Sequence, residues 1–290
     1  MDELEIVVLG CGSIGTALLQ GLLKKGNPRY TYVAHVNTAL SAERIESELE
    51  SEARQRVVIT YGQDKIVHAV ANADVVLLGV QPQTLPKLLD SQGLVDTLQD
   101  KTIISMLAGV SVSQILDMLV AKSTSTGRAN REAFTVARII PTLGATRGNS
   151  VTLLAEPSES DTADRFRRVE KILSQCGSVI RVEESVMNSA TAIGAVVHAL
   201  AIVAVDSVTD ASVAAGVPRS VAAAIASQSL NSASGLLSGK DRMLPEHLKA
   251  AMSTPGGITL NAVVDLDDSA RSGIAAAVKA AVKYANRMND

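Results

Sequence analysis

The chain has 290 residues, which is enough for about two domains. Hydrophobic residues make up 47% of it and charged residues 20%, so a sizeable core can be buried, although aromatic residues are only 2%. A net charge of −3 without a basic tract argues against a nucleic-acid partner.

Residues 4–22 carry the first strong pattern along the chain. A short apolar run is followed by three glycines with the spacing G-x-G-x-x-G and then by an apolar-periodic segment. A strand, a tight turn and a helix in this order predict a dinucleotide-binding turn, because free N–H groups at the helix start can bind phosphates. The alternative is an ordinary glycine-rich turn. The candidate cofactor-binding residues are Gly10, Gly12, Ser13, Ile14 and Gly15.

A second strand is predicted at residues 30–36. An NAD-specific enzyme places an Asp or Glu at the end of this strand, about 20 residues beyond the glycines. Here Asn37 follows the strand, and the first acid is Glu43. The missing carboxylate favours NADP(H) over NAD(H), with Asn37 as a candidate cofactor-binding residue. Arg44 is either a phosphate partner or a solvated helix arginine.

Helices and strands continue to alternate up to about residue 120, and further strand and helix signals follow the polar stretch 122–133 up to residue 182. This alternation predicts a Rossmann-type α/β fold, a doubly wound parallel sheet that binds its ligand at the carboxyl ends of the strands. The polar stretch 122–133 is predicted to be a surface loop insertion. Strands are expected at 57–60, within 73–82, and at 103–108, 135–140, 150–154 and 178–182, and helices at 41–52, 64–71, 113–119 and 161–176.

Strand signals disappear after residue 185, and Ala-rich helices follow. We therefore expect a dinucleotide-binding domain over residues 1–184 and an all-α dimerisation and substrate domain over residues 185–290. Residues 190–205 are apolar nearly all round, which predicts a helix buried on every side. Since a small domain has little room to surround it, we predict a homodimer or higher homo-oligomer. The helices are expected at about 186–214, 219–238, 245–252 and 262–288.

The same apolar stretch, 190–205, is shorter than the ~20 residues of a membrane span. No charged and apolar targeting segment opens the sequence, so no membrane partner is expected and a cytoplasmic location is predicted. Cys11 and Cys176 lie far apart and lack a metal-ligand spacing, which indicates a reduced protein without a metal site.

Several motifs, in matching order along nearly the whole chain, resemble the pyrroline-5-carboxylate reductase family, whose members make proline by reducing a cyclic imine. The most specific is the segment 253–259, Ser-Thr-Pro-Gly-Gly-Ile-Thr, which looks like the family's S-P-G-G-x-T element. The other matching segments are 10–15, 73–83, 108–111, 138–141, 210–219 and Gln228.

The chain also departs from the family pattern. Gln81 stands where a lysine is usual, Thr142 replaces an asparagine, and Leu244 replaces a histidine. The segment 195–199, Ala-Val-Val-His-Ala, replaces Gly-Ser-Gly-Pro-Ala. A divergent paralogue that reduces a substituted pyrroline or a piperideine carboxylate is therefore an alternative.

The resemblance implies NAD(P)H-dependent hydride transfer to the carbon of a C=N bond, with 1-pyrroline-5-carboxylate converted to L-proline. A cyclic imine can arrive protonated, so a hydroxyl that orients its nitrogen is enough, and the resemblance gives this catalytic role to Thr259. Without the resemblance, the segment would be an ordinary Pro-Gly-Gly turn before a helix. The substrate-binding residues implied are Thr254, Gly256, Gly257, Ile258 and Thr259. The further cofactor-binding residues implied are Val80, Gln81, Pro82, Ala108 and Gly109.

Two other classes of protein are considered. The β-hydroxyacid dehydrogenases use a lysine early in the long central helix for proton transfer, and residues 182–218 contain no lysine. A nucleotide-binding regulatory protein without catalysis is compatible with the change at 195–199, but the retained segment 254–259 argues against it.

Three further side chains have two readings each. His198 is either a satisfied buried histidine or a proline replacement near the substrate. His35 is more typical of a surface residue than of a phosphate contact. Arg138 is expected to pair with a buried carboxylate, for which Asp206 and Asp210 are candidates.

Overall fold

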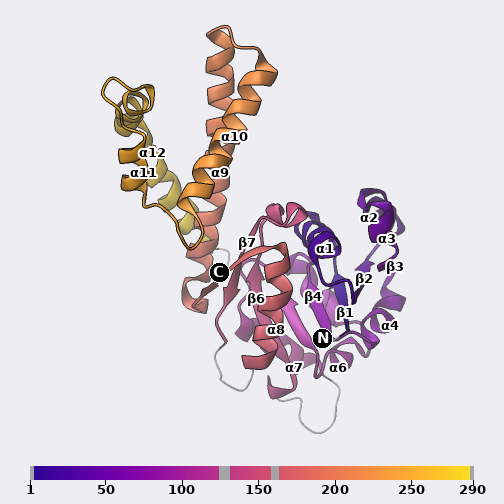
Figure 1. Ribbon diagram of the computed structural model, residues 1–290. Coiled ribbons are helices and arrows are strands. Elements are labelled where there is room, and N and C mark those ends of the chain that lie inside the picture. Colours follow the sequence, from indigo (N-terminus) through magenta and orange to yellow (C-terminus); the bar gives the residue numbers. More distant parts are fainter. Residues whose placement is uncertain (1–2, 124–130, 158–162, 288–290) are drawn as a thin grey trace. The chain divides into compact units, whose positions relative to one another are not determined.

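The structure is a computed structural model that describes residues 3–123, 131–157 and 163–287. The chain forms two compact units, one reaching to Thr191 and one spanning Ala192–Arg287 (Figure 1). The domain boundary expected between residues 184 and 185 stays a prediction.

The first unit is built on an eight-stranded sheet with the order β3-β2-β1-β4-β5-β6-β7-β8. The strands β1 to β6 are parallel, β7 is antiparallel to β6, and β8 is parallel to β7. The order of the first six is that of a Rossmann sheet, so the expected fold class is confirmed. The strands are β1 (Leu4–Leu9), β2 (Tyr30–Val36), β3 (Val57–Tyr61), β4 (Val75–Leu78), β5 (Thr102–Ser105), β6 (Thr135–Ile140), β7 (Ser150–Ala155) and β8 (Gly177–Val182).

Helices cover both faces of this sheet, because successive side chains of a strand point to opposite sides. Ile6 and Val8 pack in a core with α1, α2 and α8, whereas Val7 and Leu9 pack in a second core with α4 to α7. The helices are α1 (Ser13–Lys25), α2 (Ala39–Glu48), α3 (Ser51–Arg54), α4 (Ile66–Ala71), α5 (Leu85–Leu89), α6 (Leu94–Thr97), α7 (Val112–Lys122) and α8 (Ala163–Leu173). The 3-10 turns are η1 (Gln63–Lys65), η2 (Pro82–Thr84), η3 (Arg131–Ala133), η4 (Leu143–Arg147), η6 (Ser174–Cys176) and η7 (Glu184–Val186).

Some expected elements differ from the observed ones. The single helix expected at 41–52 is split into α2 and α3, because Leu49 between them has an extended backbone and a buried side chain. The strand expected within 73–82 is only β4, which ends where Gly79 approaches Gly10. Of the expected loop insertion at 122–133, residues 124–130 lie outside the described residues.

The second unit consists of helices. Gly216 has a φ of +95° and ends α9, and the N–H of Val217 then donates to the carbonyl of Ser212, as in a Schellman motif. Pro218 follows as the N-cap of α10, which confirms the expected break between the helices at 186–214 and 219–238. The helices are α9 (Met187–Ala214), α10 (Arg219–Leu237), α11 (Pro245–Ala251) and α12 (Ile258–Arg287).

The long helix α9 is apolar but poorly covered within one chain. Ile202 is 70% exposed, and Ile193, Val197, Val203 and Val208 are exposed as well. The helix, extended back to Glu184, is long and apolar enough to cross a membrane by length and composition. The expectation that the apolar stretch is too short is therefore wrong, because the helix continues beyond residues 190–205 at both ends. One such helix is weak evidence for a membrane protein.

Candidate active site

The glycine turn between β1 and α1 is tightly packed at two of its three glycines. Gly10 has a φ of +88°, and a Cβ atom there would lie 2.7 Å from Cγ1 of Val80. A Cβ atom on Gly15 would lie 2.7 Å from the carbonyl oxygen of Gly10. The protein's own packing therefore requires glycine at both positions.

Gly12 is different. Its φ of −68° suits any residue, and no atom lies within 4 Å of the position that a Cβ would take. Glycine here keeps open a space directly in front of α1, whose start has no side-chain cap. The N–H groups of the first turn, including those of Ser13 and Ile14, remain available for an anion. The turn thus fits a dinucleotide pyrophosphate.

The ends of β4 and β5 lie beside the same turn. The N–H of Gly79 donates to the carbonyl of Leu9 at 2.8 Å, which brings Val80 against Gly10. Gln81 is the N-cap of η2, which begins at Pro82. After β5, the chain passes through Ala108 and Gly109, and Gly109 has a φ of +76°. The expected cofactor-binding residues of β1, β4 and β5 therefore meet at one edge of the sheet.

The end of β2 lies on the other side of the glycine turn from the ends of β4 and β5. Gly10 donates its N–H to the carbonyl of His35 at 2.9 Å, and Asn37 follows β2 directly. Thr38 caps α2, whose first turn contains no acid. Arg44 of α2 donates to the carbonyl of Cys11, inside the glycine turn.

The sequence suggested that His35 is a surface residue, and the structure shows that this is wrong. It is buried, because β3 pairs with β2 on its outer side, and its Nδ1 lies 2.8 Å from Oγ1 of Thr60. Burial lowers the pKa of His35, and the nearby carboxylate of Asp64 opposes this shift.

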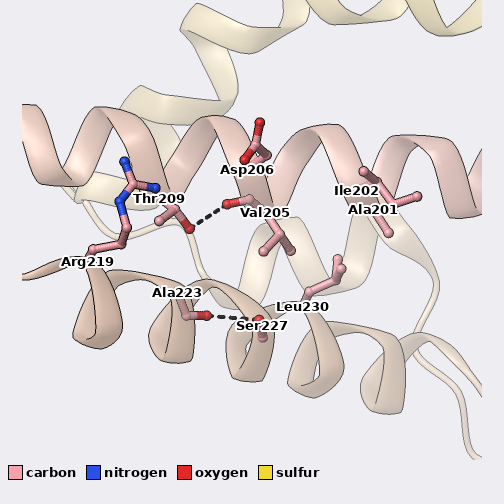
Figure 2. A pocket seen from close by; sticks show the side chains of 9 residues that line it. All are labelled: Ala201, Ile202, Val205, Asp206, Thr209, Arg219, Ala223, Ser227 and Leu230. Carbon is pink, nitrogen blue, oxygen red and sulfur yellow. Dashed lines mark hydrogen bonds between the residues drawn. The ribbon is translucent and has the colours of Figure 1, made fainter.

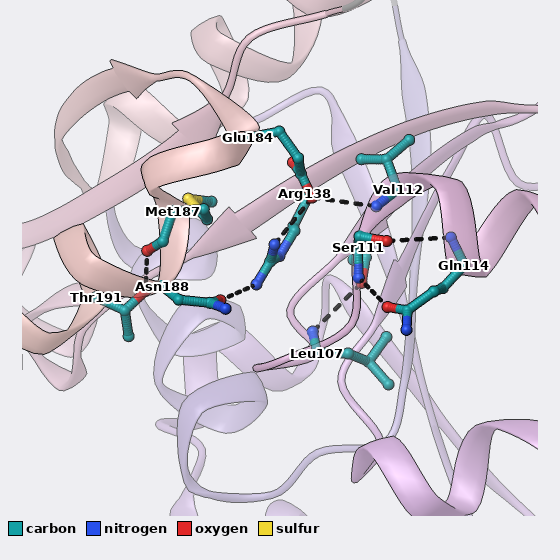
Figure 3. Close-up of polar contacts among 10 residues, drawn as sticks. Leu107, Ser111, Val112, Gln114, Arg138, Glu184, Met187, Asn188 and Thr191 are labelled. Carbon is teal, nitrogen blue, oxygen red and sulfur yellow. Dashed lines mark hydrogen bonds and ion pairs between the residues drawn. The ribbon is translucent and has the colours of Figure 1, made fainter. Parts of the chain in front are cut away.

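A polar network around the buried side chain of Arg138 lies where β6, α7 and the start of α9 meet (Figure 3). Arg138 of β6 forms an ion pair of 2.9 Å with Glu184 and donates to Oδ1 of Asn188 at 2.8 Å. Glu184 Oε1 also accepts the N–H of Val112 at 3.2 Å, next to the N-cap Ser111. The network joins the loop after Gly109 to the start of α9.

The prediction that Asp206 or Asp210 is the carboxylate partner of Arg138 is therefore wrong. Asp210 pairs with Arg219 at 2.7 Å in the second unit, and the partner in the first unit is Glu184. Glu183 and Glu184 both follow the last strand of the sheet, β8, and this position alone does not single out Glu184 as the partner.

The Pro-Gly-Gly segment of the second unit forms a turn before α12. Gly256 has a φ of +70°, and the N–H of Gly257 donates to the carbonyl of Thr254 at 2.8 Å. α12 starts at Ile258, earlier than the 262 expected from periodicity, and Thr259 lies exposed in its first turn. The five expected substrate-binding residues are therefore close together around one helix start.

An open groove of about 820 Å³ lies between α9 and α10 (Figure 2). Its walls are mainly apolar, and Asp206, Thr209 and Arg219 form a polar end.

His198 on α9 is exposed, with its Nδ1 2.7 Å from the carbonyl oxygen of Gly194. Within one chain it is not the buried histidine of the first reading. In the described ranges, no group of three or more His, Cys, Asp or Glu side chains is arranged to hold a metal ion.

Two family models match the chain. The model described as NADP oxidoreductase, coenzyme F420-dependent, matches residues 5–109, and the model described as pyrroline-5-carboxylate reductase dimerisation matches residues 184–288. Together with the fold, these matches define a class, a pyridine-nucleotide oxidoreductase whose helical domain indicates homo-oligomer formation. The two models and the relatives below together support the pyrroline-5-carboxylate reductase family, which confirms the resemblance and the assignment as an oxidoreductase of this type.

Individual relatives support the family over the full length. A pyrroline-5-carboxylate reductase of Lophium arboricola is 29% identical, with 99% of this chain and 94% of that protein covered. The one of Schizosaccharomyces pombe is 26% identical, with 96% and 97% covered.

Solved structures share the fold. The Coxiella burnetii pyrroline-5-carboxylate reductase has a TM-score of 0.81 at 21% identity, with both chains fully covered. A Plasmodium falciparum pyrroline carboxylate reductase with NADP bound has a TM-score of 0.78 at 18% identity, again with both chains fully covered.

Proposed function

We propose that this protein reduces 1-pyrroline-5-carboxylate to L-proline with NADPH as the hydride donor and works as a homodimer or higher homo-oligomer. The observation that carries the proposal is the open space at Gly12. Neither the backbone conformation nor the packing of the protein requires glycine at this position, and a dinucleotide would fill the space. Family membership and the activity named for the relatives support the choice of substrate.

At the cofactor end, each group has a definite task. The N–H groups of Gly12, Ser13 and Ile14 hold the pyrophosphate at the positive end of α1. The loops after β4 and β5 then guide the rest of the dinucleotide along the edge of the sheet. The loop residues that carry this role are Val80, Gln81, Pro82, Ala108 and Gly109, with Asn37 at the ribose end.

When bound, the reduced nicotinamide supplies a hydride to the carbon of the protonated C=N bond, which leaves a neutral ring amine. The start of α12 holds the substrate. The N–H of Gly257 already donates to the carbonyl of Thr254. The substrate carboxylate is therefore bound by the N–H groups of Ile258 and Thr259. The Thr259 hydroxyl holds the ring nitrogen, and Gly256 supplies the positive φ that the turn needs.

The preference for NADPH over NADH rests on charge. No carboxylate follows β2 before Glu43, so nothing at the strand end would repel a 2′-phosphate or select a free ribose hydroxyl. A cytoplasmic location stays a prediction.

The direct test is an assay of nucleotide oxidation at 340 nm with the purified full-length protein. NADPH and NADH are each offered with 1-pyrroline-5-carboxylate, with methylated pyrroline carboxylates and with a six-membered piperideine carboxylate. Turnover of 1-pyrroline-5-carboxylate at the highest kcat/KM supports the proposal. Turnover of none of them, with nucleotide binding retained, would contradict it and favour the regulatory reading.

A second candidate, reduction of a related cyclic imine, is favoured by the departures from the family pattern. His198, at the position of a family proline, is exposed and keeps Nε2 available because Nδ1 faces Gly194. The same assay separates the two candidates, because a substituted or larger ring would then give the higher kcat/KM.

A further inference from the structure

We propose that Arg44, in the middle of α2, is the residue through which this protein recognises the 2′-phosphate of NADPH. The inference rests on the proposed function and adds a specificity-determining residue to it. The end of β2 offers no cation for this purpose, since residues 34–43 contain neither Lys nor Arg.

The position of the guanidinium carries the argument. Arg44 Nη2 donates to the carbonyl oxygen of Cys11, the residue between Gly10 and Gly12, and this oxygen also accepts the Thr16 hydroxyl at 3.0 Å. Arg44 therefore lies in contact with the turn that fits the pyrophosphate. The ribose that carries the 2′-phosphate follows the pyrophosphate toward β2 and α2.

The guanidinium of Arg44 is fixed by two contacts and keeps further N–H donors for a ligand. Nη1 pairs with Glu48 at 2.8 Å, and the side chain is 41% exposed. An arginine has five N–H donors, and within the described part of the chain the contacts to Cys11 and Glu48 use two of them. The remaining donors suit a phosphate, which arginine binds through two parallel hydrogen bonds.

The other cations near β2, β3 and α2 have contacts of their own. Lys65, which follows β3 at the carboxyl edge of the sheet, lies over the ring of Tyr61. Arg56 donates to the carbonyls of Leu23, Asn27 and Tyr30 and lies over the ring of Tyr32. Arg54 donates to the carbonyl of Leu49, and Lys24 pairs with Glu50. Arg44 is thus the cation of this region that contacts the glycine turn.

Polar groups at the start of α2 complete the surroundings. The Thr38 hydroxyl caps the helix by accepting the N–H of Ser41, and it donates to the Ser41 hydroxyl at 3.0 Å. The first turn of α2 has no acid that would repel a phosphate.

The test is calorimetric titration of the full-length protein with NADPH and with NADH, for the wild type and Arg44→Gln. Loss of a charge-assisted contact predicts a Kd for NADPH that rises about tenfold or more, while the Kd for NADH changes less than twofold. Arg54→Gln removes the same charge from α3 and should change neither Kd. Arg44→Lys keeps the charge without the fork and should give an intermediate Kd for NADPH.

The outcomes separate the two proposals. Equal losses of NADPH and NADH affinity in Arg44→Gln would show that Arg44 only supports the turn, and unchanged NADPH affinity would show that it does not touch the phosphate. Either result overturns the inference. A wild type that binds neither nucleotide would instead overturn the proposed function.

Discussion

Nη1 of Arg138 lies 2.9 Å from Oε1 of Glu184, in an ion pair whose arginine side chain is only 2% exposed and whose glutamate is 33% exposed. Through Asn188 and the N–H of Val112, this pair connects β6 with the starts of α7 and α9. A buried charge that loses its partner is costly, so the pair is a point on which the stability of this region depends.

Glu184→Ala should destabilise the protein strongly, because it leaves the Arg138 charge buried and unpaired. We expect a loss of about 3 kcal/mol in the free energy of unfolding, at the lower end of values for broken buried pairs because Glu184 is partly solvated. Urea denaturation followed by circular dichroism, at one fixed protein concentration, measures it. The control is Asp117→Ala, which breaks the exposed pair with Arg131 and should cost less than about 1 kcal/mol. Equal losses for both variants would contradict the argument.

Most of the fold could be predicted because its signals are local. The strand β2 was predicted with its observed bounds, and the glycine turn and the alternation of strands and helices follow from patterns within a few residues. The partner of Arg138 depends instead on which strand lies beside which. Since β7 and β8 extend the sheet next to β6, the chain after β8 returns to Arg138, and no local pattern contains that order.

The candidate site also contains features that local sequence predicts and features that it does not. The roles of Gly10 and Gly15 follow from geometry that the turn imposes on its own glycines. The burial of His35 was missed because it requires β3 on the outer side of β2. The role proposed for Thr259 comes from family resemblance alone, because a threonine in the first turn of a helix has no distinctive spacing.

Gly12→Val should abolish nucleotide binding with little loss of stability, because its Cβ has open space around it and the side chain takes the place proposed for the pyrophosphate. Gly15→Val should lose both properties, since its Cβ would lie 2.7 Å from the carbonyl oxygen of Gly10. Calorimetric titration with NADPH and thermal melting of the two variants check this contrast. Retained NADPH affinity in Gly12→Val would rule out the pyrophosphate site.

Thr259→Ala should lower kcat for 1-pyrroline-5-carboxylate about a hundredfold, the effect of removing one hydrogen-bonding group from a reacting centre. Its affinity for NADPH should stay near that of the wild type, because the proposed cofactor site is built by Gly12 and its neighbours. Thr259→Ser keeps a hydroxyl and should retain most of the turnover. Steady-state kinetics together with NADPH titration measure both quantities. Parallel losses of turnover and NADPH affinity would contradict the assigned role.

The exposed apolar side chains of α9 predict self-association. The protein should be a dimer or larger by light scattering at micromolar concentration, because covering residues such as Ile202 removes apolar surface from water. Ile202→Glu should lower the mass or weaken the assembly. Val58→Glu, a change at a similarly exposed position on β3, should leave the mass unchanged. A monomeric wild type would show that α9 needs no partner subunit.

Stability should fall in acid partly through His35. Burial lowers the pKa of His35 in the folded protein, so the unfolded chain, with an ordinary histidine pKa of about 6.5, binds the proton first. The unfolding free energy therefore decreases as pH falls below about 6.5, by at most about 1.4 kcal/mol per pH unit for this one group, and His35 has no such effect at higher pH. His35→Gln should remove this component, and Asp64→Asn should strengthen it, because the Asp64 carboxylate favours the protonated ring. Urea denaturation between pH 5 and 8 measures the difference between each variant and the wild type, and identical profiles for the wild type and His35→Gln would contradict the prediction.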